Sequence, residues 1–572
     1  EAAAADGPLS ATELRSLRRC AAVLENSGMR TDAVDAHLLA GRLASAAGQR
    51  VAADRSLRSV DRLSLGAPVL VRLRGHVATA HLANAAGSPR AVAAACRLGL
   101  VDLDRHRRAL PTMELRMLAS AHGAELGAIG LRALRPDGTA ARVFQWLERT
   151  RAAALVSVEA PEPLAADSVE NEMAELRALH GELSEARAAG DAEPAGLLAK
   201  VAAAEAAVRR ASWRASPGGP PRASTGTRPP RAGEVRERLA GATLVEYGEV
   251  DGALLAVVLD GRGTRLVDLG PVAGLNATID AALFGLRRLA RPGGSPAAVR
   301  GATVATRAAL ATLSRRLLAP LAIATGAPVV VVPVGDLQRI PWAPLHDGPT
   351  TVVPSAAMWL RTAGQPRTPG QPRITDHATP AAPQRAAGPR VAVIAGPGVP
   401  GALEEATVIA ARYVNAALLA PPESSCRAVA ALLQAVDVAH FACHGRLRAD
   451  NPAFSALLLS DGPLTVHELT RRGSAPATVV LAACESGAQV GFTGGEALGF
   501  VSALLAGGST GVIASSVLVS DDGTSPLMVA VHESLAGGST VGEALWSARQ
   551  RADLDDSHQL ASWCAFDAYG AG

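Results

Sequence analysis

The chain has 572 residues, of which 48% are hydrophobic and 19% charged, and its net charge is +3. A chain of this length and composition can bury several cores and is not disordered as a whole. The near-neutral charge, with no long basic tract, argues against a nucleic-acid-binding surface.

The cysteines are widely spaced and form no CxxC pair: Cys20, Cys96, Cys426, Cys443, Cys484 and Cys564. This spacing gives no disulfide framework and predicts reduced thiols in a cytoplasmic protein. The stretch Glu1 to Pro8 lacks the basic and apolar regions of a signal peptide. No apolar run is long enough to cross a membrane. We therefore expect neither a membrane span nor a cofactor.

Residues 1–160 are predicted to form consecutive amphipathic helices. Ser10 to Glu13 has the pattern of a capping box, and Thr31 or Asp32 is expected to cap a second helix. Further helices are expected to begin near Ala67, Pro89 and Pro111. The starts recur about every 20 residues and helix pairs about every 40, which favours a helical-repeat solenoid. An irregular helical bundle is the alternative.

Residues 161–215 are predicted to form an antiparallel helical hairpin. Apolar residues recur at heptad-like spacing in its first half: Val169, Met173, Leu176, Leu179 and Leu183. Gly190-Asp191 turns the chain, and a return helix follows. Residues 216–239 are rich in Pro, Gly, Ser and Arg, which predicts a flexible linker and a domain boundary.

Residues 240–572 change to alternating strand and helix patterns. Strands are expected at Thr243 to Tyr247, Leu254 to Leu259, Arg265 to Leu269, Pro328 to Val334 and Arg390 to Ala395. Helices are expected at Thr278 to Leu289, Thr306 to Leu318, Gly401 to Asn415, Gly494 to Leu505, Pro526 to Leu535 and Val541 to Arg551. The stretch Gly364 to Gly388 is again rich in Pro and Arg. The alternation predicts an α/β region with a mostly parallel sheet.

Two apolar runs in this region end in reactive side chains. Val436 to Gly445 contains His444, and Thr478 to Gly487 contains Cys484. Each run has the length of a buried strand, and Thr465 to Arg472 between them can form a crossover helix. Such a βαβ unit makes the strands parallel and brings their C-terminal ends to one edge of the sheet. We therefore expect His444 and Cys484 to meet at that edge.

A thiol beside an imidazole is a nucleophile beside its base, so Cys484 is the candidate nucleophile and His444 the candidate base. By strand alternation we interpret Cys443 as core packing, and His440 as a core histidine rather than a second base. A zinc site built from His440, Cys443, His444 and Cys484 is a further alternative. Adjacent Cys443 and His444 point to opposite faces, however, which makes joint ligation awkward.

Two further groups are candidates for binding the substrate. Gly445 has no side chain, so a substrate carbonyl can approach its backbone N–H; together with the N–H of Cys484 this would form an oxyanion hole. Asp521 and Asp522 follow the strand-like Ser515 to Val519 and could line a pocket for a substrate side chain. The alternative for this pair is an ordinary turn before Gly523.

The motifs Ala442-Cys443-His444-Gly445 and Leu481 to Gly487 resemble the histidine and cysteine motifs of the CHAT domain. That family is a caspase-like cysteine peptidase domain attached to tetratricopeptide repeats (TPRs). Supporting matches are Gly494-Gly495-Glu496, Ala506-Gly507-Gly508, Gly537 and Glu543-Ala544-Leu545. Val331 to Trp342 resembles the family's non-catalytic lobe, and Glu148 to Ala152 a segment that precedes it. Val517-Leu518 departs from the usual Trp-Pro, and Val334 from the usual aspartate.

The resemblance implies a TPR-like helical domain at residues 1–160, a non-catalytic caspase-like lobe at 240–388 and a catalytic caspase-like lobe at 389–572. It implies that His444 is general base and acid, and Cys484 the nucleophile, of a cytoplasmic cysteine endopeptidase. The substrate would be a protein, and a regulatory protein partner would bind the helical repeats. The alternative function is a non-catalytic scaffold or adaptor that retains the fold for protein binding.

Overall fold

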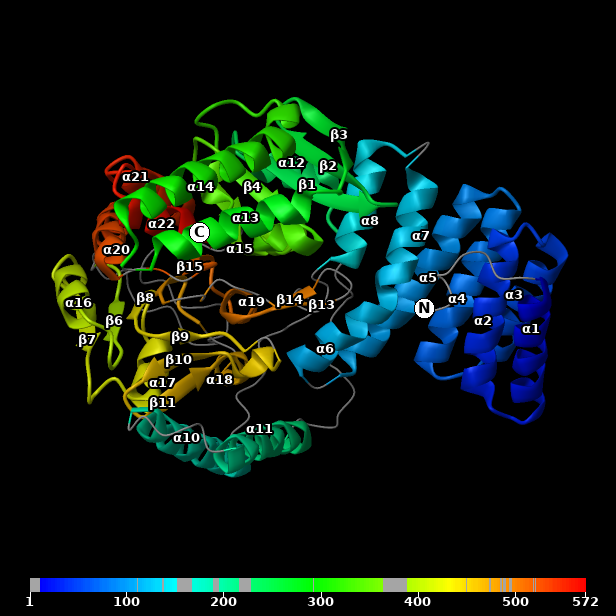
Figure 1. The fold of residues 1–572 in the computed structure, drawn as a ribbon, viewed down its shortest axis with the longest axis horizontal. Coiled ribbons are helices and arrows are strands. Elements are labelled where there is room, and N and C mark those ends of the chain that lie inside the picture. Colours follow the sequence, from blue (N-terminus) through cyan, green and yellow to red (C-terminus); the bar gives the residue numbers. More distant parts are fainter. Residues whose placement is uncertain are drawn as a thin grey trace, which may run out of the picture.

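The computed structural model describes residues 11–571 except 111, 136–137, 152–166, 189–194, 216–227, 292, 364–387, 449, 473–474, 484–485, 487–489, 493–495, 518 and 520. It contains an N-terminal helical array, a helical hairpin and an α/β region built on one long sheet (Figure 1). Ser10 of the predicted capping box and the Pro- and Arg-rich stretch 364–387 lie outside the described residues.

The helical array is formed by α1 (Ala11–Asn26), α2 (Arg30–Ala46), α3 (Arg50–Ser64), α4 (Val69–Ala85), α5 (Pro89–Arg108), α6 (Met113–Ser120), α7 (Ala124–Leu134) and α8 (Ala140–Thr150). From α1 to α5, each helix packs against the next one in the chain, and α7 packs against both α5 and α8. Helices α1 to α5 stand side by side at one end of the molecule, whereas α7 and α8 contact the sheet (Figure 1). A helical N-terminal region was predicted and is confirmed.

The turns between the first helices depend on glycine. Gly28, Gly48, Gly66 and Gly87 each follow a helix and have φ between 68° and 75°. This left-handed conformation ends a helix at little cost only when the residue has no Cβ. The predicted caps of the second helix are wrong, because α2 begins at Arg30 and places Thr31 and Asp32 inside its first turn.

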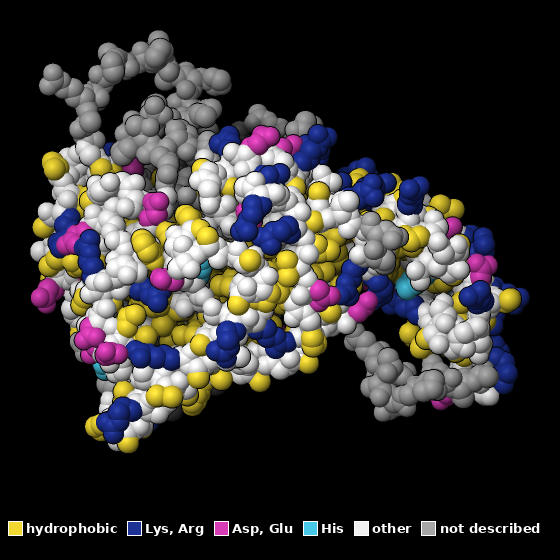
Figure 2. Space-filling view, turned by 90° about the horizontal axis from the view of Figure 1, so that it is seen from above, with side chains coloured by type: hydrophobic (Ala, Val, Ile, Leu, Met, Phe, Trp, Pro, Cys, Tyr) yellow, Lys and Arg dark blue, Asp and Glu magenta, His cyan; other side chains and the backbone are white. Residues whose placement is uncertain are grey.

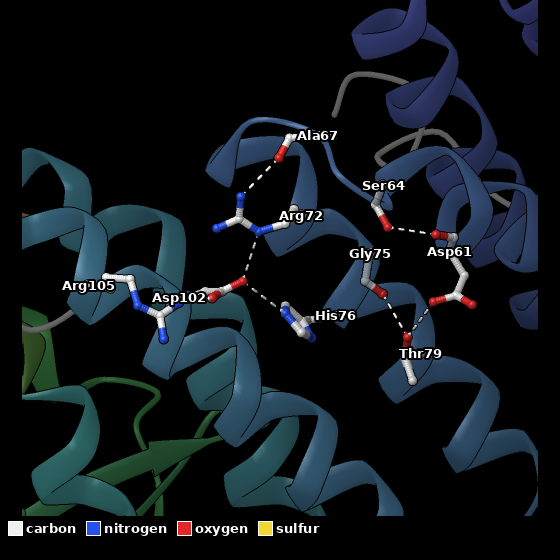
Figure 3. A network of polar contacts seen from close by, with 9 residues as sticks. All are labelled: Asp61, Ser64, Ala67, Arg72, Gly75, His76, Thr79, Asp102 and Arg105. Atoms are coloured by element: carbon white, nitrogen blue, oxygen red, sulfur yellow. Dashed lines mark hydrogen bonds and ion pairs between the residues drawn. The ribbon is translucent and has the colours of Figure 1, made fainter.

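Polar contacts tie adjacent helices of the array together (Figure 3). The carboxylate of Asp102 on α5 accepts hydrogen bonds from Arg72 Nε (3.0 Å) and His76 Nε2 (3.4 Å) on α4. Burial raises the pKa of Asp102, but these two bonds outweigh it and hold the pKa below its usual value. Thr79 on α4 donates to Asp61 on α3 at 3.1 Å. The array is therefore fixed by polar contacts as well as by its apolar core.

The predicted hairpin consists of α10 (Asp167–Ala188) and α11 (Ala195–Ala215), which pack against each other. Its buried apolar seam joins the main core: Val169, Met173, Leu176, Val201, Ala204, Val208 and Ala211. The predicted linker is wrong in its last part, because helix α12 (Ala232–Arg238) forms there. The Glu234 carboxylate accepts the N–H of Arg231 at 2.9 Å, and Val235 is buried. Residues 216–227 of the linker lie outside the described residues.

The sheet has eleven strands in the order β3-β2-β1-β4-β5-β16-β15-β12-β8-β6-β7. Their bounds are β1 (Thr243–Val250), β2 (Ala253–Asp260), β3 (Gly263–Pro271), β4 (Val329–Val332), β5 (Thr350–Val352), β6 (Val391–Ala395), β7 (Ala416–Leu419), β8 (Val438–Ala442), β12 (Thr478–Ala482), β15 (Gly511–Ser515) and β16 (Phe566–Gly570). The pairs β1–β2, β2–β3 and β15–β16 are antiparallel, and the other neighbours are parallel. The predicted mostly parallel sheet is confirmed.

Strand β16, which the sequence patterns did not reveal, joins the two halves of the sheet. It pairs with β15 on one side and with β5 on the other. Its Asp567 is buried, and the carboxylate accepts the backbone N–H of Ala343 at 2.7 Å. The last strand of the chain therefore closes the gap between residues 240–363 and residues 388–515.

Helices cover both faces of this sheet (Figure 1). In β4, Val330 and Val332 pack with α8, α12 and α15 (Ala356–Ala363), whereas Val329 and Val331 pack with the core that contains α13 (Leu275–Leu289) and α14 (Pro296–Leu317). Around the second half lie α16 (Ala402–Ala410), α17 (Cys426–Leu433), α18 (Val466–Arg472), α19 (Phe500–Ala506), α20 (Asp521–Ala536), α21 (Val541–Arg549) and α22 (Ser557–Ala565). Helices on both faces explain why the strands are almost continuously apolar.

Two small sheets project from the second half. One has the order β11-β10-β9 and consists of β9 (Gly445–Arg446), β10 (Ala456–Leu459) and β11 (Gly462–Thr465); the other pairs β13 (Val490–Phe492) with β14 (Glu496–Leu498). The predicted helix Gly494 to Leu505 is therefore wrong in its first part, where β14 forms, and α19 begins only at Phe500.

Charges of both signs are interspersed on the face seen in Figure 2, where Lys and Arg form small groups rather than one continuous tract. In the part of the chain that the structure describes, the helices are too short or too polar to cross a bilayer.

Candidate active site

The two strands that precede His444 and Cys484 lie side by side and end level. Strands β8 and β12 are parallel, with Thr478 opposite Val438 and Ala482 opposite Ala442. Helix α18 precedes β12 in the connection, as the predicted βαβ unit requires. Strand β6 lies on the other side of β8, and its connection through α16 to β7 runs in the opposite direction. The C-terminal ends of β6 and β8 therefore flank a topological switch point, where open α/β sheets place their ligands.

His444 lies at this switch point and is exposed. Its Nε2–H donates a hydrogen bond to the backbone carbonyl of Gly398, in the loop after β6, at 3.1 Å. A carbonyl that accepts one ring N–H fixes the orientation of the imidazole and leaves the other nitrogen as a proton acceptor. In this orientation Nδ1 of His444 is the ring nitrogen that can accept a proton.

Gly445 is the first residue of β9 and lies opposite Leu457 of β10. The N–H of Leu458 donates to the carbonyl of His444 at 2.9 Å. Antiparallel pairs alternate between bonded and non-bonded, so Gly445 and Leu457 form a non-bonded pair. The N–H of Gly445 therefore points away from β10, as an oxyanion donor requires.

Cys484 and Glu485 lie outside the described residues. Ser486, the next described residue, is buried; its hydroxyl donates to the carbonyl of Leu481 (3.1 Å) and accepts the N–H of Ser515 (3.2 Å). These bonds fix the end of the cysteine motif to β12 and β15.

Asp521 and Asp522 form the start of helix α20 rather than a turn before Gly523. Their side chains lie outside the described part of the structure. The proposed role of this pair in a substrate pocket stays a prediction.

Cys443 is buried, as predicted, and lies against Gly396 at the end of β6. A Cβ added to Gly396 would lie 2.4 Å from Cys443 Cβ and 2.8 Å from the carbonyl oxygen of Leu458. Only a glycine allows β6 to approach the histidine motif this closely.

His440 is a core histidine, as predicted, and both of its ring nitrogens have partners. Nε2 lies 2.9 Å from the carboxylate of Glu405 on α16, and Nδ1 lies 3.1 Å from Nε2 of His532 on α20. His532 continues the chain of contacts to the hydroxyl of Tyr413 at 2.9 Å. Burial, with His440 and Arg412 nearby, lowers the pKa of His532 well below its usual value. The network joins two helices to the sheet and leaves His440 no free nitrogen for catalysis or metal.

The family comparison agrees with this geometry. Residues 307–571 match the sequence model of the CHAT domain. This part of the chain is similar to the CHAT domain. The matched residues include the second part of α14, strands β4 and β5 of the first half of the sheet, and the whole second half with both motifs.

Two structures of the Saccharomyces cerevisiae separase–securin complex are similar to this chain. Both are 10% identical to this chain. The alignments cover 97% of this chain and 48% and 47% of the chains in the two complexes, with TM-scores of 0.44 and 0.49. The chain thus spans about half the length of the structures it matches. A search of curated proteins gave no significant match.

The contacts of His440 argue against its part in the zinc alternative. Among the described residues, no group of three or more His, Cys, Asp or Glu side chains could hold a metal ion. His440 contacts Glu405 on α16 and His532 on α20, and both of its ring nitrogens are engaged. The proposed set His440, Cys443, His444 and Cys484 therefore does not assemble through His440.

Sequence reasoning did not find Gly398, whose carbonyl orients His444. The signal was present: Gly396-Pro397-Gly398 directly follows the strand predicted at Arg390 to Ala395. A Gly-Pro-Gly run after a buried strand indicates a loop with close backbone approach. The contact between Gly398 and His444 was not predictable, because it depends on the position of β6 beside β8 in the sheet.

Proposed function

We propose that this chain is a cysteine endopeptidase in which Cys484 is the nucleophile and His444 the general base and acid. The observation that carries the proposal is that β8 and β12, the strands that precede the two motifs, are parallel neighbours that end level beside the switch point. The orientation of His444 by the Gly398 carbonyl supports it, since a base needs a fixed ring.

In this mechanism, the Cys484 thiol gives its proton to His444 and its sulfur attacks the carbonyl carbon of a peptide bond. The oxyanion is held by the N–H groups of Gly445 and Cys484. His444 then protonates the departing amine, which leaves a thioester. Water, deprotonated by His444, hydrolyses the thioester and regenerates the thiol.

The substrate is proposed to be a protein and the location the cytoplasm, where the thiol stays reduced. The helical array is proposed to bind a regulatory protein partner. One contact supports a link between the array and the site, because α6 packs against β14, which follows the cysteine motif. The hairpin makes a second contact near the site, where α10 packs against β11, which follows the histidine motif.

The experiment is cleavage of a peptide library by the purified chain and by Cys484→Ala and His444→Ala. Loss of the nucleophile or base is expected to lower kcat by about 10⁴-fold or more. Cys20, an exposed cysteine on α1, supplies the matched control: Cys20→Ala should cleave normally. A peptide electrophile should label Cys484 and leave Cys20 unlabelled. If cleavage survives both substitutions in folded protein, Cys484 and His444 are not the catalytic pair. If no cleavage and no selective labelling occur, the chain is a scaffold rather than a peptidase.

A further inference from the structure

The segment that carries His444 and Gly445 is clamped to the α10–α11 hairpin by an ion pair that the proposed mechanism does not use. After β9, the chain reaches Arg448, whose Nη1 donates to Glu205 Oε1 on α11 at 2.7 Å. The same carboxylate accepts Nδ2 of Asn451 at 2.6 Å. Glu205 is 3% exposed and Asn451 7% exposed. A carboxylate buried this deeply is costly unless it keeps these partners.

The clamp is close to the candidate site along the chain. Arg448 follows Gly445 by three residues, and its own N–H donates to the hydroxyl of Ser455 at 3.0 Å. Ser455 immediately precedes β10, the strand that pairs with β9 and binds the carbonyl of His444. The guanidinium also binds Asp450 at 2.9 Å and 2.7 Å, and this contact lowers the pKa of Asp450 to about 2.

The rest of the hairpin holds the same small sheet. Arg177 on α10 pairs with Glu468, whose carboxylate also accepts the N–H of Thr465 at the start of α18. The hydroxyl of Ser212 on α11 lies 2.9 Å from Nε2 of the buried His467. Figure 1 shows the hairpin lying along β10, β11 and α18 on the side away from the first half of the sheet. Among these contacts, only that of Glu205 reaches the segment that follows His444 and β9.

We propose that Glu205 and Arg448 are positioning residues that hold His444 and Gly445 in place through β9, so that displacing the hairpin switches the proposed peptidase. The inference rests on the proposed function of that site. It gives the hairpin a regulatory role. A partner that displaces α11 would break the ion pair between Glu205 and Arg448, which lies just after the residues proposed as base and oxyanion donor. A misplacement of about 1 Å in a catalytic group can cost about 10²-fold in rate.

The test uses the full chain with Glu205→Gln, Arg448→Met and both together, and Arg58→Met on helix α3 as the control for loss of an ion-paired arginine. Each single variant is expected to lower kcat about 10- to 100-fold with KM changed by less than about twofold. The double variant should be no worse than the single ones, because the residues act as one unit. Arg58→Met should behave as the unchanged protein.

A second readout does not depend on activity. Amide hydrogen exchange over residues 444–458 should be about tenfold faster in each clamp variant, while exchange in β6 and β12 stays the same. Uniformly faster exchange with a lower melting temperature would make the pair a stability element only and overturn the proposal. Unchanged exchange would overturn it as well. If the unaltered chain cleaves nothing, the peptidase proposal fails, but the exchange result still decides the clamp.

Discussion

Single residues at the candidate site are constrained by backbone approach as much as by chemistry. Gly396 is the clearest case, because the hydrogen position on its Cα faces Cys443, the residue before His444. His444 in turn depends on the carbonyl of Gly398, from the same loop. The loop after β6 therefore supplies both the space and the orientation that the histidine motif needs.

We expect Gly396→Ala to lower the free energy of unfolding by about 1–3 kcal/mol, because the new Cβ overlaps the backbone oxygen of Leu458 and forces a shift. Cleavage should fall as well, since the shift occurs beside His444. Denaturant unfolding measures the first effect and peptide hydrolysis the second. The matched control is Gly301→Ala on α14, where nothing lies within 4 Å of the added Cβ; equal effects at both glycines would contradict the argument.

At the level of elements, helix α8 is anchored to the sheet region by buried ions. The Glu148 carboxylate accepts the N–H groups of Ala356 (2.7 Å) and Ala357 (2.9 Å) at the start of α15. Arg151, just after α8, donates to the carbonyl of Pro333 at 2.9 Å and lies 3.2 Å from the carboxylate of Glu246. Burial raises the pKa of Glu148 and of Glu246 and lowers that of Arg151. The helical array and the sheet therefore share a buried polar junction.

Glu148→Ala should cost about 1–3 kcal/mol of unfolding free energy, since it leaves two N–H groups of α15 buried without their acceptor. Glu237→Ala on α12, an exposed position, is the control and should change stability by less than about 0.5 kcal/mol. Chemical denaturation of both variants compares the two losses. Similar small losses would mean that α15 finds other acceptors and that the junction contributes little.

At the scale of the whole molecule, one sheet runs through both halves because β16 lies between β5 and β15. Asp567 on β16 marks this junction, and its carboxylate binds the other half at Ala343. Burial raises the pKa of Asp567 from 3.8 to about 7. Between these two pH values the folded protein retains a proton that the unfolded chain has lost, so this group makes the free energy of unfolding fall as pH rises.

The expected result is that Asp567→Asn reduces this fall between pH 4 and 7 and is more stable than the unaltered protein at about pH 8, with little difference at low pH. Thermal unfolding at several pH values measures it. Asp555→Asn is the control, because that side chain is 93% exposed. Parallel pH profiles for Asp567→Asn and the unaltered chain would show that the carboxyl is not protonated in the fold.

Local patterns in the chain were sufficient to predict many of the elements and both motifs. Apolar runs predicted β8 and β12, helical periodicity predicted the array and the hairpin, and the residues around His444 and Cys484 pointed to the CHAT family. Such features depend on neighbours within a few residues, through backbone conformation and side-chain alternation. Where local preference was ambiguous, as at Gly494 to Leu505 and in the last part of the linker, the predictions were wrong.

Packing between distant segments decided the rest. The place of β16, the Gly398 carbonyl beside His444, and the Glu205–Arg448 pair each join residues far apart in the chain. Their partners are chosen by strand order and by the burial of whole faces, which a short stretch of sequence does not encode. The sequence motifs pointed to the proposed cysteine–histidine chemistry. The folded arrangement of the sheet and the hairpin decided which groups surround the histidine motif.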